Sequence, residues 1–492
     1  MFRKLVTASF SLLCFQLSAQ TETGRIIKIE TRAGLYLSTS GKTPYLNQAG
    51  QYGLVPAEAG VFFLNGAVNK AYDSLHTPQN KLRPWGYSYG LEAQVNLSAH
   101  SRVLLPVAHI SARYRGIELY AGRKRELLGL ADSTGTWRSF IWSGNALPIP
   151  KIQLSTPGYI PLVARGLISA KMGYSHGWFG KQPYTEKYYL HQKWLYIKIG
   201  RADAKVNMYG GINQQAQWGG YSEILKDNFV SMNGYMPADA FTYLNVVLPL
   251  KSWKVPAGKH YPYEKEYRFG NHLGTIDLGL SLNLAGGTLR AFRQTPWEDG
   301  QAPEVFLSWD GNYTLMYEMK EGAALRKISL EWVSTQRQGL QISKMAKFLG
   351  WKEKHPSESQ EYLNHSQYRD GWSYQGKGLG TPAIVPYTFL INSTKVEGFP
   401  NFSIDNQVTA PALTLAGKIK NINYTFHSGY IISSGLLNAP RPEKLRQFTS
   451  RLTGNFPLPK YGLQGRVDIG FDSGQLYGNQ TGVNLAVSKR WR

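Results

Sequence analysis

The sequence predicts an all-β fold, a transmembrane antiparallel β-barrel of the outer-membrane type. Three observations lead to this prediction. Apolar and polar residues alternate in segments of roughly ten residues along the whole chain, turn residues (Gly, Pro, Asn) separate these segments, and no apolar run of about 18 residues follows residue 20. Strands with one aliphatic and one polar face suit a barrel with lipid outside and water inside.

The alternation is clearest in "GTIDLGLSLNLA", residues 274–285, where Leu278, Leu280 and Leu282 alternate with Gly279, Ser281 and Asn283. The same pattern recurs at residues 89–98, 327–332, 422–427, 466–472 and 483–491. A soluble sandwich with one buried face is the alternative. Small or charged residues on the polar face, and Tyr and Trp near many strand ends, favour the membrane barrel.

Chain length sets the size of the barrel. A strand with its share of turn and loop takes about 22–28 residues, so residues 20–492 predict 16–20 strands, in even number. A barrel of this size has a wide lumen unless chain segments plug it.

The first 19 residues have the features of a secretory signal peptide. Arg3 and Lys4 precede the apolar stretch Leu5–Leu17, and small residues end with Ala19. Cys14 is the only cysteine, so the exported chain is expected to have no disulfide. A lipoprotein anchored through Cys14 is the alternative, which Leu13 disfavours because a small residue usually precedes the lipidated cysteine.

The formal net charge is +23, which favours an anionic partner. Export and the scattered placement of Lys and Arg argue against nucleic acid. Acidic polysaccharide and anionic membrane lipid remain as partners.

Motifs for catalysis are weak. Ser175 in "GYSHG" matches the nucleophile elbow of hydrolases, but no helical pattern follows it, so a hairpin loop is the better interpretation. The sequence has no HExxH or CxxC motif and no phosphate loop. We therefore expect no enzyme activity, no metal and no cofactor.

The longest stretch without strand alternation lies around residues 345–385. Its many aromatic residues argue for an ordered loop. Aromatic faces beside polar groups suit sugar rings, and packing inside the lumen as a plug is the equal alternative. The candidate polysaccharide-binding residues are Trp351, Tyr362, Asn364, His365, Tyr368, Arg369, Asp370, Trp372 and Tyr374.

Five segments resemble, in order, landmarks of the Wzi capsule-assembly family: "SGNALPIPKIQLSTPGY" (143–159), "HQKWLYIKIG" with "YGGINQQAQWGG" (191–220), "FRQTPWEDG" (292–300), "EWVSTQRQG" (331–339) and "YLNHSQYRDGWSYQGKGLGTP" (362–382). The resemblance implies an outer-membrane barrel of 18 strands that acts as a non-catalytic surface lectin. The C-terminus departs from the usual aromatic final residue, because Arg492 follows Trp491.

The expected function is therefore binding or organising capsular or other surface polysaccharide at the cell outer membrane. The alternative is a porin or substrate-specific channel, because a polar lumen of this size could conduct. The sequence leaves open the identity of the polysaccharide, the oligomeric state, and whether the lumen is open or plugged.

Overall fold

The computed structural model describes residues 27–74, 83–248, 263–264, 267–298, 308–320, 324–340, 360–391 and 401–491. The predicted signal peptide lies outside these residues and stays a prediction. The strands are β1 Ile27–Ser38, β2 Val61–Lys70, β3 Trp85–Leu97, β4 Arg102–Tyr114, β5 Ile117–Arg123, β6 Lys151–Ser155, β7 Ile160–Val163, β8 Ile168–Lys181, β9 Glu186–Ile199, β10 Val206–Trp218, β11 Asn271–Leu284, β12 Gly287–Glu298, β13 Gly311–Met319, β14 Leu325–Ser334, β15 Ser373–Tyr374, β16 Lys377–Gly378, β17 Val408–Ile419, β18 Ile422–Gly435, β19 Pro440–Leu458, β20 Leu463–Gly474 and β21 Gln480–Trp491.

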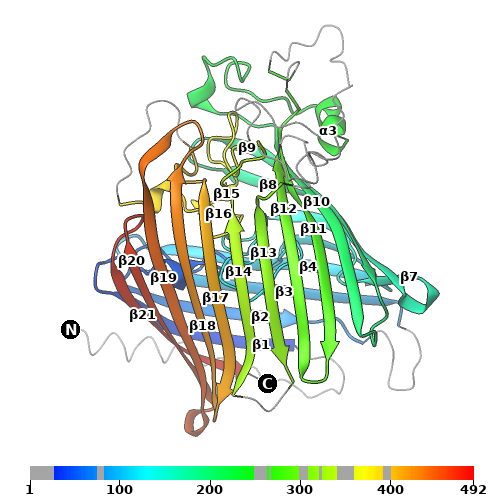
Figure 1. The fold of residues 1–492 in the computed structure, drawn as a ribbon, viewed down its shortest axis with the longest axis vertical. Coiled ribbons are helices and arrows are strands. Elements are labelled where there is room, and N and C mark those ends of the chain that lie inside the picture. The colour runs from blue at the N-terminus through cyan, green and yellow to red at the C-terminus, as the bar shows by residue number, and fades with distance from the viewer. Residues whose placement is uncertain are drawn as a thin grey trace.

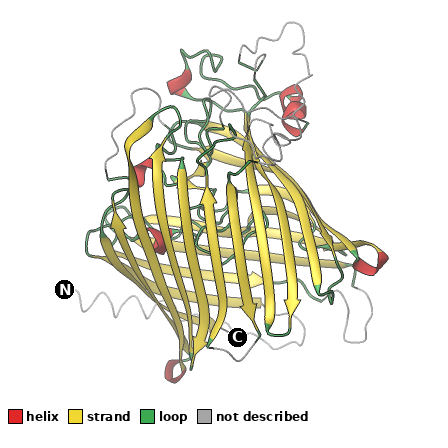
Figure 2. Ribbon diagram, in the orientation of Figure 1, coloured by secondary structure: helices red, strands yellow, loops and turns green. Residues whose placement is uncertain are grey.

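Helix is scarce in the described part of the chain (Figure 2). The α-helices are α2 (Tyr45–Gln48) and α3 (Ala240–Val247), and single 3₁₀ turns occupy Ala164–Gly166, Glu223–Leu225, Tyr387–Phe389 and Pro459–Tyr461. No helix among the described residues has the length and apolar character needed to cross a bilayer.

The strands close into a barrel. Each strand of the wall pairs antiparallel with its neighbour, and β1 pairs with β21 over a register that runs from Ile29 opposite Trp491 to Ser38 opposite Gly482. The described sheet contains 19 strands, of which β6 and β7 both pair with β8 and share one position in the wall. The result is a closed 18-stranded antiparallel barrel (Figure 1), within the predicted range.

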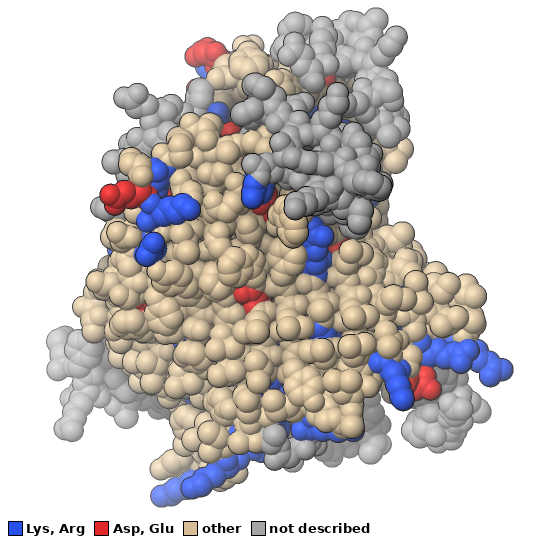
Figure 3. Space-filling model, viewed as in Figure 1, with Lys and Arg blue, Asp and Glu red and all other residues tan. Residues whose placement is uncertain are grey.

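The predicted alternation matches the two faces of the wall. In β11, Leu278 and Leu280 are exposed on the outside, whereas Asp277 and Ser281 are buried in the lumen. The other predicted segments fall in β3, β14, β18, β20 and β21. Side chains without charge form a broad band on the face shown in Figure 3, and Lys and Arg gather along its lower rim. An apolar outer band on a closed barrel is the form in which β-structure crosses a bilayer.

Turn length distinguishes the two ends of the barrel. The described turns at one end are short, at residues 115–116, 164–167, 200–205, 285–286, 420–421 and 459–462. Long connections lie at the other end, and their described parts include residues 39–60, 124–150, 219–248 and 360–391. Short turns face the periplasm in outer-membrane barrels, so the long connections lie on the extracellular side.

The main hydrophobic core lies inside the barrel. Most of it comes from the first inner segment (residues 124–150) and the second inner segment (residues 360–391). Residues 45–49, Phe402 and inward-facing side chains of the wall, such as Phe179 and Tyr188, pack against these segments. Both inner segments belong to extracellular connections that fold back into the lumen, where Figure 1 labels β15 and β16 of the second inner segment. The lumen is therefore plugged in its extracellular half, which answers a question that the sequence leaves open.

The lipid-facing surface gives a test of this arrangement. Leu330, in the middle of β14, and Ile419, at the periplasmic end of β17, are similarly exposed on the outside, at 51% and 55%. We expect Leu330→Arg to lower the free energy of unfolding by about 2–4 kcal/mol and Ile419→Arg by about 0–1 kcal/mol, because the cost of a charge falls from the bilayer midplane to the interface. Denaturant titration of the vesicle-inserted protein measures both. An equal loss of unfolding free energy in the two variants would contradict the assigned position of the barrel in the membrane.

Candidate functional site in the lumen

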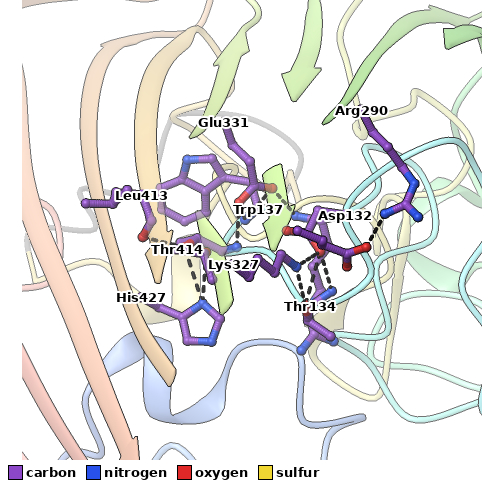
Figure 4. Close-up of polar contacts among 12 residues, drawn as sticks. Asp132, Thr134, Trp137, Arg290, Lys327, Glu331, Leu413, Thr414 and His427 are labelled. Carbon is purple, nitrogen blue, oxygen red and sulfur yellow. Dashed lines mark hydrogen bonds and ion pairs between the residues drawn. The ribbon is translucent and has the colours of Figure 1, made fainter. Parts of the chain in front are cut away.

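The carboxylate of Glu331, in the barrel wall, binds the backbone of the first inner segment. Glu331 projects from β14 into the lumen and is buried. It accepts hydrogen bonds from the backbone N–H groups of Thr136 at 2.5 Å, Trp137 at 3.2 Å and Arg138 at 2.9 Å (Figure 4). Three donors converge on one carboxylate, which replaces much of the hydration that the carboxylate loses in the lumen.

Further wall side chains hold the same segment. Asp277 of β11 accepts from the backbone N–H of Leu130 at 2.8 Å, and Gln294 of β12 accepts from that of Phe140 at 2.9 Å. Lys327 of β14 forms an ion pair with Asp132 (Figure 4). Burial raises the pKa of the Asp132 carboxyl, but the Lys327 ammonium outweighs it and sets the pKa below its usual range. The first inner segment is thus fixed to three strands of the wall.

Trp137 anchors this segment to β17 and β18, the strands that follow β14 in the wall. Its indole N–H donates to the carbonyl of Ala410 in β17 at 3.0 Å, and its ring is fully buried. The ring lies directly over Gly429 of β18, where a Cβ would come within 2.3 Å of it. Glycine at this position is therefore what allows the indole to approach the wall so closely.

The second inner segment docks on the first. The indole N–H of Trp372 donates to the carbonyl of Ile141 at 2.7 Å. The backbone N–H of Ser143 donates to the carbonyl of Leu379 at 2.9 Å, and that of Thr381 to Phe140 at 2.8 Å. These backbone and indole bonds satisfy polar groups that would otherwise be buried without partners.

The candidate polysaccharide-binding residues lie mostly within this plug. Trp351 lies outside the described residues. His365 and Arg369 are half-buried. The buried candidates are Tyr362, Asn364, Tyr368, Asp370, Trp372 and Tyr374. A role in sugar binding stays a prediction for the set, and in the described arrangement their aromatic rings pack against protein.

The contacts of these residues explain their burial. The Tyr362 hydroxyl donates to Asp310 at 3.1 Å, and the guanidinium of Arg123 donates to the Tyr374 hydroxyl at 2.9 Å. Asp370 accepts from the backbone N–H of Tyr184 at 3.2 Å. Burial raises the pKa of the Asp310 and Asp370 carboxyls to about 6, despite these hydrogen bonds. The side-chain oxygens of Tyr362, Asp370 and Tyr374 thus have protein partners.

A polar cavity of about 330 Å³ remains in the lumen beside the first inner segment. One side of the cavity comes from β5, β6, β8 and β9, and the other comes from the first inner segment, through residues 124, 126–128 and 142. Its charged and aromatic lining residues are Glu118, Lys124, Glu126, Lys151, Lys171, Trp142 and Trp194. The sequence analysis missed this site. Alternation in "ISAKMGYSHG" places Lys171 on the inward face, but the register that brings β8 beside β9 is not readable from one strand.

Ser175 lies within strand β8, so the predicted hairpin loop at this position is wrong. Its hydroxyl is buried and donates to the amide oxygen of Gln192 at 3.2 Å. His176 is on the other face of the strand, among Trp178, Tyr189 and Trp218. The serine and the histidine therefore project to opposite sides of the wall, as neighbours on a strand do. Within the described part of the chain, no cluster of His, Cys, Asp and Glu has the grouping of a metal site.

Comparison with solved structures finds matches to outer-membrane proteins. The chain matches the crystal structure of OccAB2 of Acinetobacter baumannii at 9% identity and a TM-score of 0.47, covering 94% of this chain and 98% of that chain. It matches the outer membrane protein OprD of Pseudomonas aeruginosa at 10% identity and a TM-score of 0.43, covering 95% of each. No protein-family model matches the chain, and no curated protein does. The geometry of this chain defines its class by itself: the protein is a closed 18-stranded β-barrel of the outer membrane.

The resemblance to the Wzi family is wrong. No model of that family matches, and the solved structures that match are proteins of the OprD and Occ type. The five segments that carried the resemblance are short and rich in Gly, Trp and Tyr. Strand ends at the membrane interface and aromatic plugs select these residue types in any large barrel, so the segments did not identify a family.

The Glu331 contact gives a prediction. Hydrogen bonds to a charged group contribute about 1.5–3 kcal/mol, so Glu331→Ala is expected to speed amide exchange at residues 136–138 by roughly tenfold to a hundredfold. Hydrogen exchange followed by mass spectrometry measures it. Glu318→Ala is the matched control, because Glu318 also faces the lumen but pairs with Arg290 nearer the periplasmic end. Unchanged exchange in Glu331→Ala would show that the carboxylate does not hold the segment.

Proposed function

We propose that this protein is a substrate-specific channel of the outer membrane, non-catalytic, with a lumen that the inner segments close on the extracellular side. The observation that carries the proposal is the polar, charged cavity between the barrel wall and the first inner segment. An inert scaffold has no need of charged side chains around a cavity, because their burial costs free energy. A general pore is disfavoured, because the inner segments fill half of the lumen.

The difference between the two halves of the lumen supports a closed state. In the extracellular half, Glu331 and Gln294 are at most 3% exposed. In the periplasmic half, the side chains of Arg290 and Glu318 are 31% and 42% exposed. Water therefore reaches the periplasmic half, and a solute can cross only when the inner segments shift.

A reversible lock on the first inner segment tests the proposal. The hydroxyl oxygens of Thr136, in the segment, and Thr414, in the wall strand β17, lie 3.0 Å apart. Cysteines at both positions place two sulfur atoms close to bonding distance. We expect vesicles with the wild-type protein to release small acids faster than protein-free vesicles. Oxidation of Thr136→Cys/Thr414→Cys should bring release to the protein-free rate, and a reductant should restore it.

The wild-type protein under the same oxidant is the control, because Cys14 is its only cysteine. Folding of each protein is checked by its resistance to detergent before heating. A folded wild-type barrel that releases neither acids nor neutral sugars faster than protein-free vesicles would rule out the channel.

We also propose binding of surface polysaccharide as a second function, favoured by exposed aromatic residues on the extracellular connections. Phe229 and Tyr235 are 71% and 60% exposed. Tyr235 also packs against Tyr221, with ring centroids 4.7 Å apart. Such rings can cover the apolar faces of sugars, and weak contacts add along a repeating polymer. The positive net charge of +23 suits an acidic polymer.

A glycan array separates this second function from the first. We expect the wild-type protein to bind acidic polysaccharides on the array and the double variant Phe229→Ala/Tyr235→Ala to lose this binding. Tyr461→Ala is the matched control, because Tyr461 is 63% exposed in a short turn at the periplasmic end. Equal binding by wild type and both variants would remove these rings as the binding surface.

A further inference from the structure

The lumenal cavity contains two pairs of opposite charges and one additional cation. Lys124 pairs with Glu118 at 2.6 Å, and Lys151 pairs with Glu126 at 2.8 Å. Lys171 of β8 also borders the cavity, yet among the described residues its side-chain ammonium forms neither a hydrogen bond nor an ion pair. The cavity therefore holds one more positive charge than negative charge.

The neighbouring polar groups are already engaged by other donors. The amide oxygen of Gln192 accepts from Lys151 at 2.7 Å and from Ser175 at 3.2 Å. Glu126 is the carboxylate that attracts Lys171, but it is ion-paired with Lys151 at 2.8 Å and accepts from the amide of Gln153 at 2.9 Å. The Lys171 ammonium therefore has no hydrogen bond or ion pair of its own in the described lining.

Trp194 provides a second donor without a partner. It lies on β9, is 8% exposed and borders the same cavity, and its indole N–H has no acceptor in the described part of the chain. A Cβ on Gly173 would lie 2.0 Å from the indole, so the glycine allows the ring to lie against β8. A buried N–H without a partner costs about 1–3 kcal/mol, which a bound acceptor recovers.

We infer that this cavity binds a small organic anion, with its carboxylate or phosphate accepting from Lys171 and Trp194. The inference rests on the proposed channel and names its substrate class. The cavity volume of about 330 Å³ lies at the lower end of the range for small-molecule sites. The rings of Trp142 and Trp194 supply an apolar surface for the body of the solute.

Three probes with the same sugar body test the inference: glucuronate, glucose 6-phosphate and glucose. They carry a carboxylate, a phosphate and no charge, respectively. Titration calorimetry on the full-length barrel in detergent at pH 7 measures each affinity. We expect at least one of the acids to bind about tenfold or more tightly than glucose, because a hydrogen bond to a charged group is worth at least that factor. The acid that is preferred identifies the anion.

Conservative variants measure how much each of the two donors contributes to anion binding. Lys171→Met keeps the length of the side chain and should weaken acid binding by about tenfold to a hundredfold, to the level of glucose. Trp194→Phe keeps an aromatic ring and should weaken the binding of the acids more than the binding of glucose. Lys198→Met is the matched control, because Lys198 also faces the lumen from β9 but does not border the cavity. It should leave all three affinities unchanged.

The outcomes distinguish the inference from the proposed function. Equal affinity for acids and glucose, no binding of any probe, or unchanged acid binding in Lys171→Met would overturn the anion site. The release of acids from vesicles would be unaffected by that result and would still support a channel. If acid binding depends on Lys171 but the barrel releases no solute from vesicles, the anion site stands and the channel is rejected.

Discussion

Closure of the backbone hydrogen-bond network is the constraint on which the rest of this structure depends. Within lipid, an unpaired N–H or C=O has no water to bond, so the last strand must meet the first. The ladder between β1 and β21 joins residues that are more than four hundred positions apart in sequence. Every side chain of the wall must then face either lipid or lumen, and this requirement generates the alternation that is visible in the sequence.

Closure also creates a lumen too wide for wall side chains to fill. In the extracellular half, the protein fills it with its own connections, which bring buried backbone groups and buried aromatic rings. Wall residues such as Glu331, Asp277 and Gln294 serve as hydrogen-bond acceptors for that backbone. The polar inner face of the wall therefore has two roles: it binds the inner segments where they fill the lumen, and it surrounds a charged cavity where they do not.

The sequence predicted the strands of the barrel wall better than the segments that fill the lumen. Leu278 and Asp277 could be assigned to opposite faces because strand periodicity depends only on adjacent residues. The position of Trp372 could not be predicted, because an aromatic residue among glycines is equally suited to a sugar surface and to a plug. Its burial depends on Ile141, far away in sequence. Lys171 and Trp194 were missed for a similar reason. Strand register decides that they border the same cavity, and contacts with distant residues decide which neighbouring acceptors are already occupied.

The ties of the first inner segment have a consequence for the order of assembly. Thr136 and its acceptor Glu331 are separated by 195 residues, and Phe140 and Gln294 by 154. Strands β11 to β14 must be in place before residues 130–140 can find their partners. During biogenesis the segment is therefore an undocked apolar chain beside a half-built sheet, and docking is a late step with high contact order. Chaperoning in the periplasm has to cover this segment as well as the lipid-facing strands.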